Sequence, residues 1–223
     1  MSIQTFISVD TETGGLFPDS NPLLSVGIGV YALDPATLAY TTVSENEWTL
    51  KPSQFPDAVI DIEALRKNGL DPEKLERDGY LASDVATNIC NVLDQAKQAG
   101  GRFHVLGQNY AFDRGFLHKY IPDPAFHRLD INVQVDLMTL SAAYNSIVCP
   151  DWDHPPTRSL GSMCARLGVT NEKAHSALAD ARATFLCYVA LQKKFREIGR
   201  IVQITKDNAI KHNELNLLVA NLA

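Results

Sequence analysis

The sequence has few cysteines, no excess of basic charge and no internal repeat. Its 223 residues include four cysteines (Cys90, Cys149, Cys164 and Cys187) and no C-x-x-C pair, which favours ordinary thiols of a reducing compartment over a disulfide framework. Lysine and arginine number 20 against 26 aspartates and glutamates, so the net charge is −6. This balance excludes a protein that holds nucleic acid mainly by bulk positive charge, but not an enzyme that reaches phosphates through bound cations.

The sequence also lacks long apolar runs. No stretch approaches the roughly 18 residues that would cross a membrane, and the first residues lack the basic start and apolar core of a signal peptide. With 45% apolar and 21% charged residues, the composition is that of an ordinary globular protein. We therefore expect a cytoplasmic protein that has no contact with membranes.

The apolar and turn residues predict a sheet flanked by helices. We expect strands at residues 5–9, 23–33, 40–50, 103–106 and 131–135. We expect helices at residues 56–65, 82–96, 112–120, 137–144, 160–167 and 176–196. Three strands in succession suggest an antiparallel meander, and the later alternation of helix and strand predicts an α/β sheet with helices on its faces.

We expect residues 1–197 to form one domain and residues 198–223 a C-terminal helical tail. The tail carries an apolar stripe at helical spacing, made by Leu215, Leu218, Val219 and Leu222. This stripe would pack on its own domain or, as an alternative that stays open, on a partner or a second subunit.

Two acids follow the first predicted strand. Side chains at i and i+2 of a strand share a face, so Asp10 and Glu12 point the same way with their backbones roughly 7 Å apart. Taken alone, this pair could be a polar strand end that enters a loop.

A third acid, Asp113, follows the strand at 103–106. It shares a helix face with Leu117 and Tyr120 and therefore borders an apolar row. Asn109 can cap this helix, and the helix dipole alone could explain an acid in the first turn.

A fourth acid, Asp180, begins a helix that is apolar nearly all round. It heads the row Thr184, Cys187 and Leu191, where an unpaired carboxylate would be costly. His175, five residues earlier, fits a loop before the helix from which it reaches the site, or else a surface position at the helix start.

Four carboxylates at one edge of a sheet repel one another. Each close pair costs about 1 kcal/mol in water and about 4 kcal/mol at an effective dielectric constant of about 20. Divalent cations remove this cost, and oxygen ligands suit Mg²⁺ or Mn²⁺ better than zinc.

These motifs together resemble the DEDDh (DnaQ-like) family of 3′–5′ exonucleases, which includes polymerase proofreading subunits, ribonuclease T and oligoribonuclease. Asp10 and Glu12 in DTETGGL match its first motif, Asp113 in NYAFDRGFL its second, and His175 and Asp180 in HSALAD its third. The resemblance spans about residues 5–192. Gly14, where many members carry threonine, is a small departure that touches no ligand position.

The resemblance implies a ribonuclease H-like fold, a mixed five-stranded sheet flanked by helices, and a catalytic set of His175, Asp10, Glu12, Asp113 and Asp180. The four acids would bind two Mg²⁺ ions, for which Mn²⁺ would substitute, and His175 would be the general base. The substrate would be the 3′ end of single-stranded DNA or RNA, released as nucleoside 5′-monophosphates. The resemblance also implies substrate contacts from Thr11, Leu16, Asn109 and Phe112.

Several alternatives stay open. A non-catalytic module of the same fold could bind nucleic acid or a replication protein, but all five catalytic residues are present. A polymerase partner, a homodimer and an endonuclease of the same broad fold also stay open. Asp136 fits a helix cap, and Asp151, Asp153 and His154 fit a solvated loop better than a set of ligands.

Overall fold

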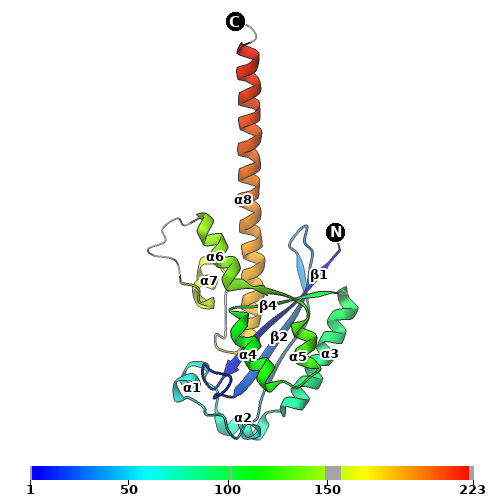
Figure 1. The fold of residues 1–223 in the computed structure, drawn as a ribbon, viewed down its shortest axis with the longest axis vertical. Helices are drawn as coiled ribbons and strands as arrows, with labels where there is room; N and C mark the ends of the chain where they lie inside the picture. The colour runs from blue at the N-terminus through cyan, green and yellow to red at the C-terminus, as the bar shows by residue number, and fades with distance from the viewer. Residues whose placement is uncertain (1, 101, 149–156, 221–223) are drawn as a thin grey trace.

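The fold is built on one mixed sheet of five strands. The computed structural model describes residues 2–100, 102–148 and 157–220 (Figure 1). The strand order is β3-β2-β1-β4-β5. The strands are β1 (Gln4–Thr13), β2 (Leu23–Leu33), β3 (Tyr40–Thr49), β4 (Phe103–Gly107) and β5 (Val133–Asp136). The antiparallel meander predicted for β1, β2 and β3 is confirmed, while β4 and β5 join it in parallel.

The central strand, β1, is covered on both faces. Ile7 and Val9 belong to a core on one face, and Phe6 belongs to a second core on the other. Successive side chains of a strand point to opposite faces, so a strand that is covered on both faces has an almost continuous run of apolar residues in its sequence. This explains why residues 5–9 are apolar and β-branched.

Three helices cover the first face: α3 (Ala82–Gly100), α4 (Tyr110–Tyr120) and α5 (Ala125–Asp130). The second face carries α6 (Leu137–Val148), α7 (Leu160–Leu167) and α8 (Ala177–Ala220). On that face Phe185 of α8 stacks on Tyr31 of β2 with ring centroids 3.9 Å apart. The predicted sheet flanked by helices is therefore confirmed, although α5 was not predicted.

The segment between β3 and α3 differs from the prediction. It contains the 3-10 turn η1 (Pro52–Gln54) and two short helices, α1 (Ile62–Asn68) and α2 (Pro72–Asp78), so the helix predicted at residues 56–65 is wrong before Ile62. The chain there is held by the loop that follows β1, since Val59 N–H donates to Ser20 O and Asp61 N–H donates to Gly14 O. These long-range bonds satisfy the backbone without a helix.

Asp136 caps two helices, whereas Asn109 caps none. One carboxylate oxygen of Asp136 accepts from Thr139 N–H at 2.8 Å in α6, which confirms the predicted cap, and the other accepts from Tyr110 N–H at 2.7 Å in α4. Asn109 precedes α4 with φ of 60°, and its side chain makes no capping bond. The prediction that Asn109 caps this helix is therefore wrong, because a neighbouring strand supplies the acceptor.

Helix α8 extends beyond the body of the molecule (Figure 1). Its last contacts with the domain include Phe195, whose ring meets Tyr144 edge-on at 5.6 Å, and Arg196, which donates to Ala36 O at 2.7 Å. All residues from Gly199 to Lys206 are exposed. Within the described residues, no helix combines the length and apolar character needed to cross a membrane. The side chains of the predicted tail stripe, and Asp151, Asp153 and His154, lie outside the part of the chain that the structure describes.

We predict that a chain ending at Ile198 folds like the full chain. The side chains that the structure describes after this point, residues 199–206, are all exposed. Their removal sacrifices little buried apolar surface, so the thermal midpoint should stay within about 3 °C, the effect of roughly 1 kcal/mol in a domain of this length. A chain ending at Gln192 is the control, because it also loses Phe195 and Arg196, and it should melt several degrees lower. Equal losses of midpoint in the two chains would contradict a boundary near residue 197.

Candidate active site

The end of β1 presents two acids to α8. Asp10 lies opposite Gly27 and Glu12 opposite Ser25 in the antiparallel pairing with β2. A Cβ atom on Gly27 would come within 2.2 Å of the Ala177 carbonyl carbon, so the first turn of α8 lies directly against this glycine. Because Gly27 has no side chain, the start of α8 can pack against the sheet beside Asp10, which is paired with Gly27.

Asp113 reaches the same site from the opposite face of the sheet. It is only 2% exposed, and its Oδ1 accepts from the Thr11 hydroxyl at 2.7 Å. Because Thr11 points to the face opposite that of Asp10 and Glu12, this bond ties the start of α4 to the end of β1. The predicted burial of Asp113 is confirmed.

The third group of residues lies in the turn before α8 and in its first turn. Asp180 Oδ1 accepts from the Asn171 side-chain amide at 2.5 Å, and Asp180 Oδ2 accepts from His175 N–H at 3.2 Å. His175 has φ of 67°, in the left-handed region that non-glycine residues seldom occupy, and its side chain is exposed. It therefore lies on the turn before the helix, as predicted.

These residues share one cavity of about 400 Å³. It is lined by Asp10, Thr11, Glu12, Leu16, Phe112, Asp113, His175 and Asp180, together with Lys67, Asn68 and Gln108 among others. Leu16 is 70% exposed, and Phe112 is partly exposed while its ring packs 5.0 Å from that of Phe116. All the predicted site residues meet here except Asn109, which lines a separate open cavity of about 560 Å³ beside Tyr110 and Arg114.

Burial raises the pKa of three carboxylates of the site, and neighbouring negative charges add to the rise. Burial raises the pKa of Asp10 well above its usual value, and the charges of Asp113, Asp180, Glu12 and Glu47 add to this. Burial, and then Asp180, raises the pKa of Glu12 from 4.5 to about 7, although Lys67 opposes the shift. Burial also raises the pKa of Asp113 from 3.8 to about 7, against the hydrogen bond from Thr11. Without cations, Glu12 and Asp113 therefore keep their protons to a higher pH than free carboxyl groups do.

The donor set fits a hard divalent cation. Ligand atoms of Glu12, His175 and Asp180 all lie within 4.8 Å of one another, and Asp10 and Asp113 line the same cavity. Carboxylate oxygens are the donors that Mg²⁺ and Mn²⁺ prefer, and a bound cation would offset both the cost of burying these charges and their mutual repulsion. The chemistry of the site therefore supports metal binding.

Ribonuclease T proteins are similar in sequence to this chain over most of its length. It is 28% identical over 204 residues to ribonuclease T of Blochmanniella pennsylvanica and 26% identical over 197 residues to that of Shewanella oneidensis. These alignments cover 86% of this chain in both cases, and 86% and 84% of the relatives. No family model matches the sequence.

Solved structures of Escherichia coli exonuclease I share the fold. The structure with a dT13 oligonucleotide superposes with a TM-score of 0.67 at 18% identity, over 89% of this chain. The chain spans only 43% of that longer protein.

Together these similarities indicate a DnaQ-like DEDDh 3′–5′ exonuclease. The ribonuclease T relatives and the shared fold support a metal-dependent 3′–5′ exonuclease, in agreement with the resemblance seen in the three sequence motifs. The ribonuclease H-like sheet expected for a DEDDh protein is confirmed as well.

Two polar residues of this DEDDh site were not predicted from the sequence. Asn171 donates to Asp180, and Glu47 of β3 accepts from the Ser176 hydroxyl at 3.0 Å. Asn171 stands four residues before His175 in a polar loop, where nothing in its spacing distinguishes it. Glu47 is 129 residues from Ser176 in the sequence, and only the pairing of β2 with β3 brings the two residues together.

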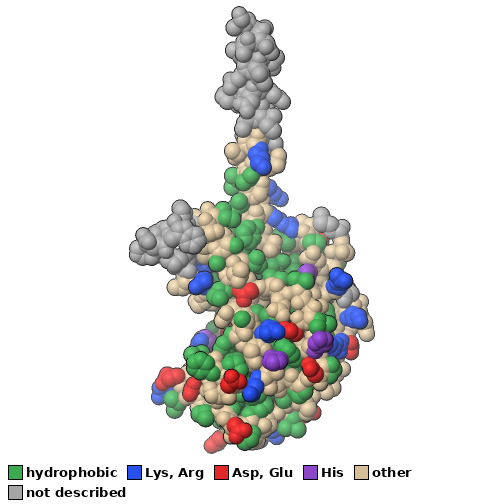
Figure 2. All heavy atoms as spheres, in the orientation of Figure 1, with side chains coloured by type: hydrophobic (Ala, Val, Ile, Leu, Met, Phe, Trp, Pro, Cys, Tyr) green, Lys and Arg blue, Asp and Glu red, His purple; other side chains and the backbone are tan. Residues whose placement is uncertain are grey.

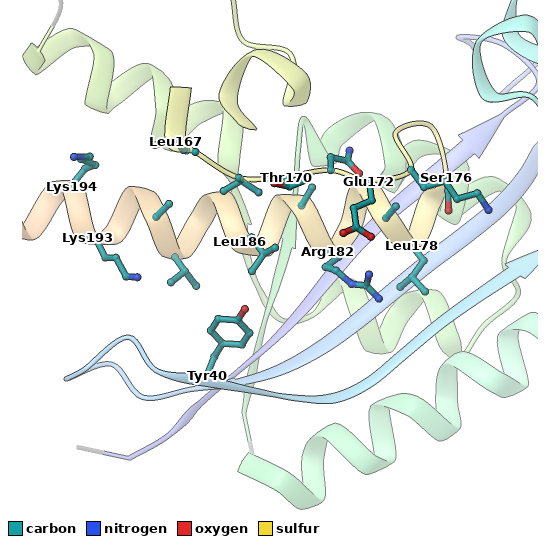
Figure 3. Close-up of a pocket in the computed structure, with 18 of the residues that line it drawn as sticks. Tyr40, Leu167, Thr170, Glu172, Ser176, Leu178, Arg182, Leu186, Lys193 and Lys194 are labelled. Carbon is teal, nitrogen blue, oxygen red and sulfur yellow. The ribbon is translucent and has the colours of Figure 1, made fainter. Parts of the chain in front are cut away.

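A second cavity lies along α8 and is lined in part by residues 167–173 and Ser176, which precede this helix (Figure 3). It has a volume of about 980 Å³ and extends from Ser176 and Leu178 past Arg182 to Lys193 and Lys194, with Tyr40 on the opposite wall. It contains none of the four acids of the DEDDh motifs. The acid cluster therefore lies in the smaller of the two cavities.

We predict that the metal-free protein loses stability as pH rises through the carboxylate titration. Glu12 and Asp113 bind protons more tightly when folded, so the stabilisation is complete below about pH 4 and is lost as pH passes about 7. In EDTA the thermal midpoint should therefore fall between pH 5 and pH 8, and Mn²⁺ should reverse the fall at the upper end.

The variant Glu12→Gln isolates this effect from other titrations. The substitution removes one of the groups with a raised pKa. As pH rises, the thermal midpoint of the variant should therefore fall less than that of the parent. A parent midpoint in EDTA that rises over this range, with no difference from the variant, would refute the assignment.

We predict that Gly27→Ala displaces the first turn of α8. The added Cβ meets helix backbone at 2.2 Å, which cannot turn aside as a flexible side chain could, so we expect destabilisation of about 1–3 kcal/mol or more and loss of nuclease activity. Gly161→Ala, in open space in α7, is the matched control and should be neutral or slightly stabilising. Urea denaturation of both variants measures the difference, and equal stabilities would refute the close approach.

Proposed function

We propose that the chain removes nucleotides one at a time from the 3′ end of single-stranded DNA or RNA and releases nucleoside 5′-monophosphates. The observation that carries this proposal is the convergence of Asp10, Glu12, Asp113, His175 and Asp180 on one cavity from β1, α4 and the start of α8. The ribonuclease T relatives support an RNA substrate by their name, and the exonuclease I complex with dT13 supports a single-stranded DNA substrate.

The four acids would hold two divalent ions, Mg²⁺ or Mn²⁺. We propose that Asp10 and Asp113, together with Glu12 and Asp180, would hold these ions, with Glu12 and Asp180 on the side of the attacking water. When bound, the ions would supply positive charge beside the attacked phosphodiester and its departing 3′ oxygen. Thr11 fixes the Asp113 carboxylate, and Asn171 fixes that of Asp180.

His175 would act as the general base. Its backbone N–H is bonded to Asp180, while its exposed side chain lines the acid cavity, so the imidazole is free to accept the proton of the attacking water. A general base in this position typically contributes about 10²–10⁴-fold to the rate.

Apolar side chains at the mouth of the cavity would hold the terminal base. Leu16 is exposed and Phe112 partly so, and both line the cavity, so a base could stack on Phe112 against Leu16. The hydroxyl of Thr11 is already bonded to Asp113, which limits its part to the cavity wall. Asn109 lines a different cavity, so we propose that it braces the turn before α4.

The non-catalytic alternative has less support, because every carboxylate and the histidine of the motifs line one cavity. A homodimer or a polymerase partner would add to the exonuclease function and would not replace it. Neither is needed to complete the acid cluster, which comes from one chain.

The decisive experiment uses 5′-labelled single-stranded RNA and DNA oligomers with Mg²⁺, Mn²⁺ or EDTA. We expect a metal-dependent ladder that shortens from the 3′ end, abolished by Asp10→Ala. The faster of the two substrates then defines the preferred nucleic acid. Binding of oligomers without cleavage in any metal would refute the catalytic proposal, and cuts within the chain of the oligomer would indicate an endonuclease.

A further inference from the structure

The turn that carries His175 is held at each end by a hydrogen bond that involves a residue outside the DEDDh motifs, Asn171 or Glu47. Its first residue, Asn171, donates to Asp180, and its last, Ser176, donates to Glu47. We call residues 171–176 the histidine turn. Between its two anchored ends, His175 occupies a left-handed backbone conformation that costs free energy and persists only where the surroundings impose it.

The anchor at Ser176 joins three elements. Glu47 of β3 accepts from the Ser176 hydroxyl with both carboxylate oxygens, at 3.0 and 3.3 Å, and from Ser25 of β2 at 3.2 Å. Ser25 is fully buried and lies opposite Glu12 in the sheet, and Ser176 is 9% exposed. Glu47 therefore fixes the start of α8 relative to the strand position of Glu12.

The anchor at Asn171 acts on a proposed metal ligand. Its amide and the His175 N–H take one oxygen each of the Asp180 carboxylate, which sets the direction in which the remaining lone pairs point. The Asp180 N–H in turn donates to Ser176 O at 2.9 Å. The histidine turn and the first turn of α8 are thus connected through Asp180.

We propose that Asn171 and Glu47 are positioning residues of the exonuclease: Asn171 orients Asp180 for metal binding, and Glu47 holds His175 in place through Ser176. This inference rests on the proposed function, since it assigns His175 and Asp180 the roles given above. Each acts through the group that it holds, which is Asp180 for Asn171 and Ser176 for Glu47.

The test for Glu47 separates its hydrogen bond from its charge. Glu47→Gln keeps an oxygen acceptor for Ser176 and removes the charge, whereas Ser176→Ala removes the bond and keeps the charge. We expect Glu47→Ala and Ser176→Ala to lower kcat by about 10-fold or more with little change in KM, as partner losses around a site commonly do. Glu47→Gln should stay close to the parent.

A double-mutant cycle identifies the residue through which Glu47 acts. In a His175→Ala background, Glu47→Ala should cause no further loss of kcat, because the group that it positions is gone. Glu45→Ala is the matched control: Glu45 lies two residues away on β3 and also contacts α8, but at Arg182 and away from the histidine turn. It should leave kcat unchanged whatever its effect on the thermal midpoint.

The test for Asn171 measures metal binding without turnover. Asn171→Ala should raise the Mn²⁺ concentration that gives half of the full thermal stabilisation by about 10–100-fold. Glu172→Ala, the exposed neighbour, is the control and should leave that concentration unchanged.

The outcomes distinguish this inference from the proposed function. A parent protein without metal-dependent cleavage would refute the function itself. An active parent in which Glu47→Gln loses as much kcat as Glu47→Ala, while Ser176→Ala loses nothing, would show an effect of charge and overturn the positioning role of Glu47. Unchanged Mn²⁺ dependence in Asn171→Ala would overturn the role of Asn171.

Discussion

The alternation of side chains along β1 is the constraint on which the site depends. Because β1 is the central strand and is covered on both faces, successive side chains at its end point toward helices on opposite faces of the sheet. Asp10 and Glu12 point toward α8, and Thr11 between them bonds to Asp113 of α4. A shift of one residue in the register of β1 would exchange these faces, so Asp10 and Glu12 would point away from α8.

The same arrangement concentrates negative charge where water is scarce. Burial raises the pKa of Asp10, Glu12 and Asp113, and the mutual repulsion of these groups adds to the shift for each of the first two. A fold that only had to be stable would avoid such a cluster, since an unpaired buried carboxylate is expensive. The hydrogen bonds from Thr11 and Asn171 orient two of the carboxylates, but they cannot neutralise them. The cluster makes physical sense as a binding site for cations, and cations that bind the folded state would stabilise it.

Much of this site could be predicted because its chemistry lies in short segments. Asp10 and Glu12 follow an apolar strand, and Asp113 and Asp180 lie in helices whose periodicity alone places them against buried surfaces. The parts that sequence reasoning missed depend on neighbours that are distant along the chain. Asp136 of β5 replaces Asn109 as the cap of α4, and the loop after β1 pairs with residues 59–61 and prevents the predicted helix there. Glu47 belongs to the same class, since only the sheet register brings it to Ser176.

The charge of the chain limits how it can hold a polyanion. With a net charge of −6, the protein cannot rely on a general attraction for phosphates, and on the face that Figure 2 shows, acidic and basic side chains are interspersed. Under the proposed function, affinity must then come from the site itself. Cations bound by the acids would attract the terminal phosphates, and the exposed Leu16 together with Phe112 would contact the last base. An enzyme that binds only near the terminus needs a strand that can enter a cavity of about 400 Å³ end first, and this favours a free single-stranded 3′ end over a duplex.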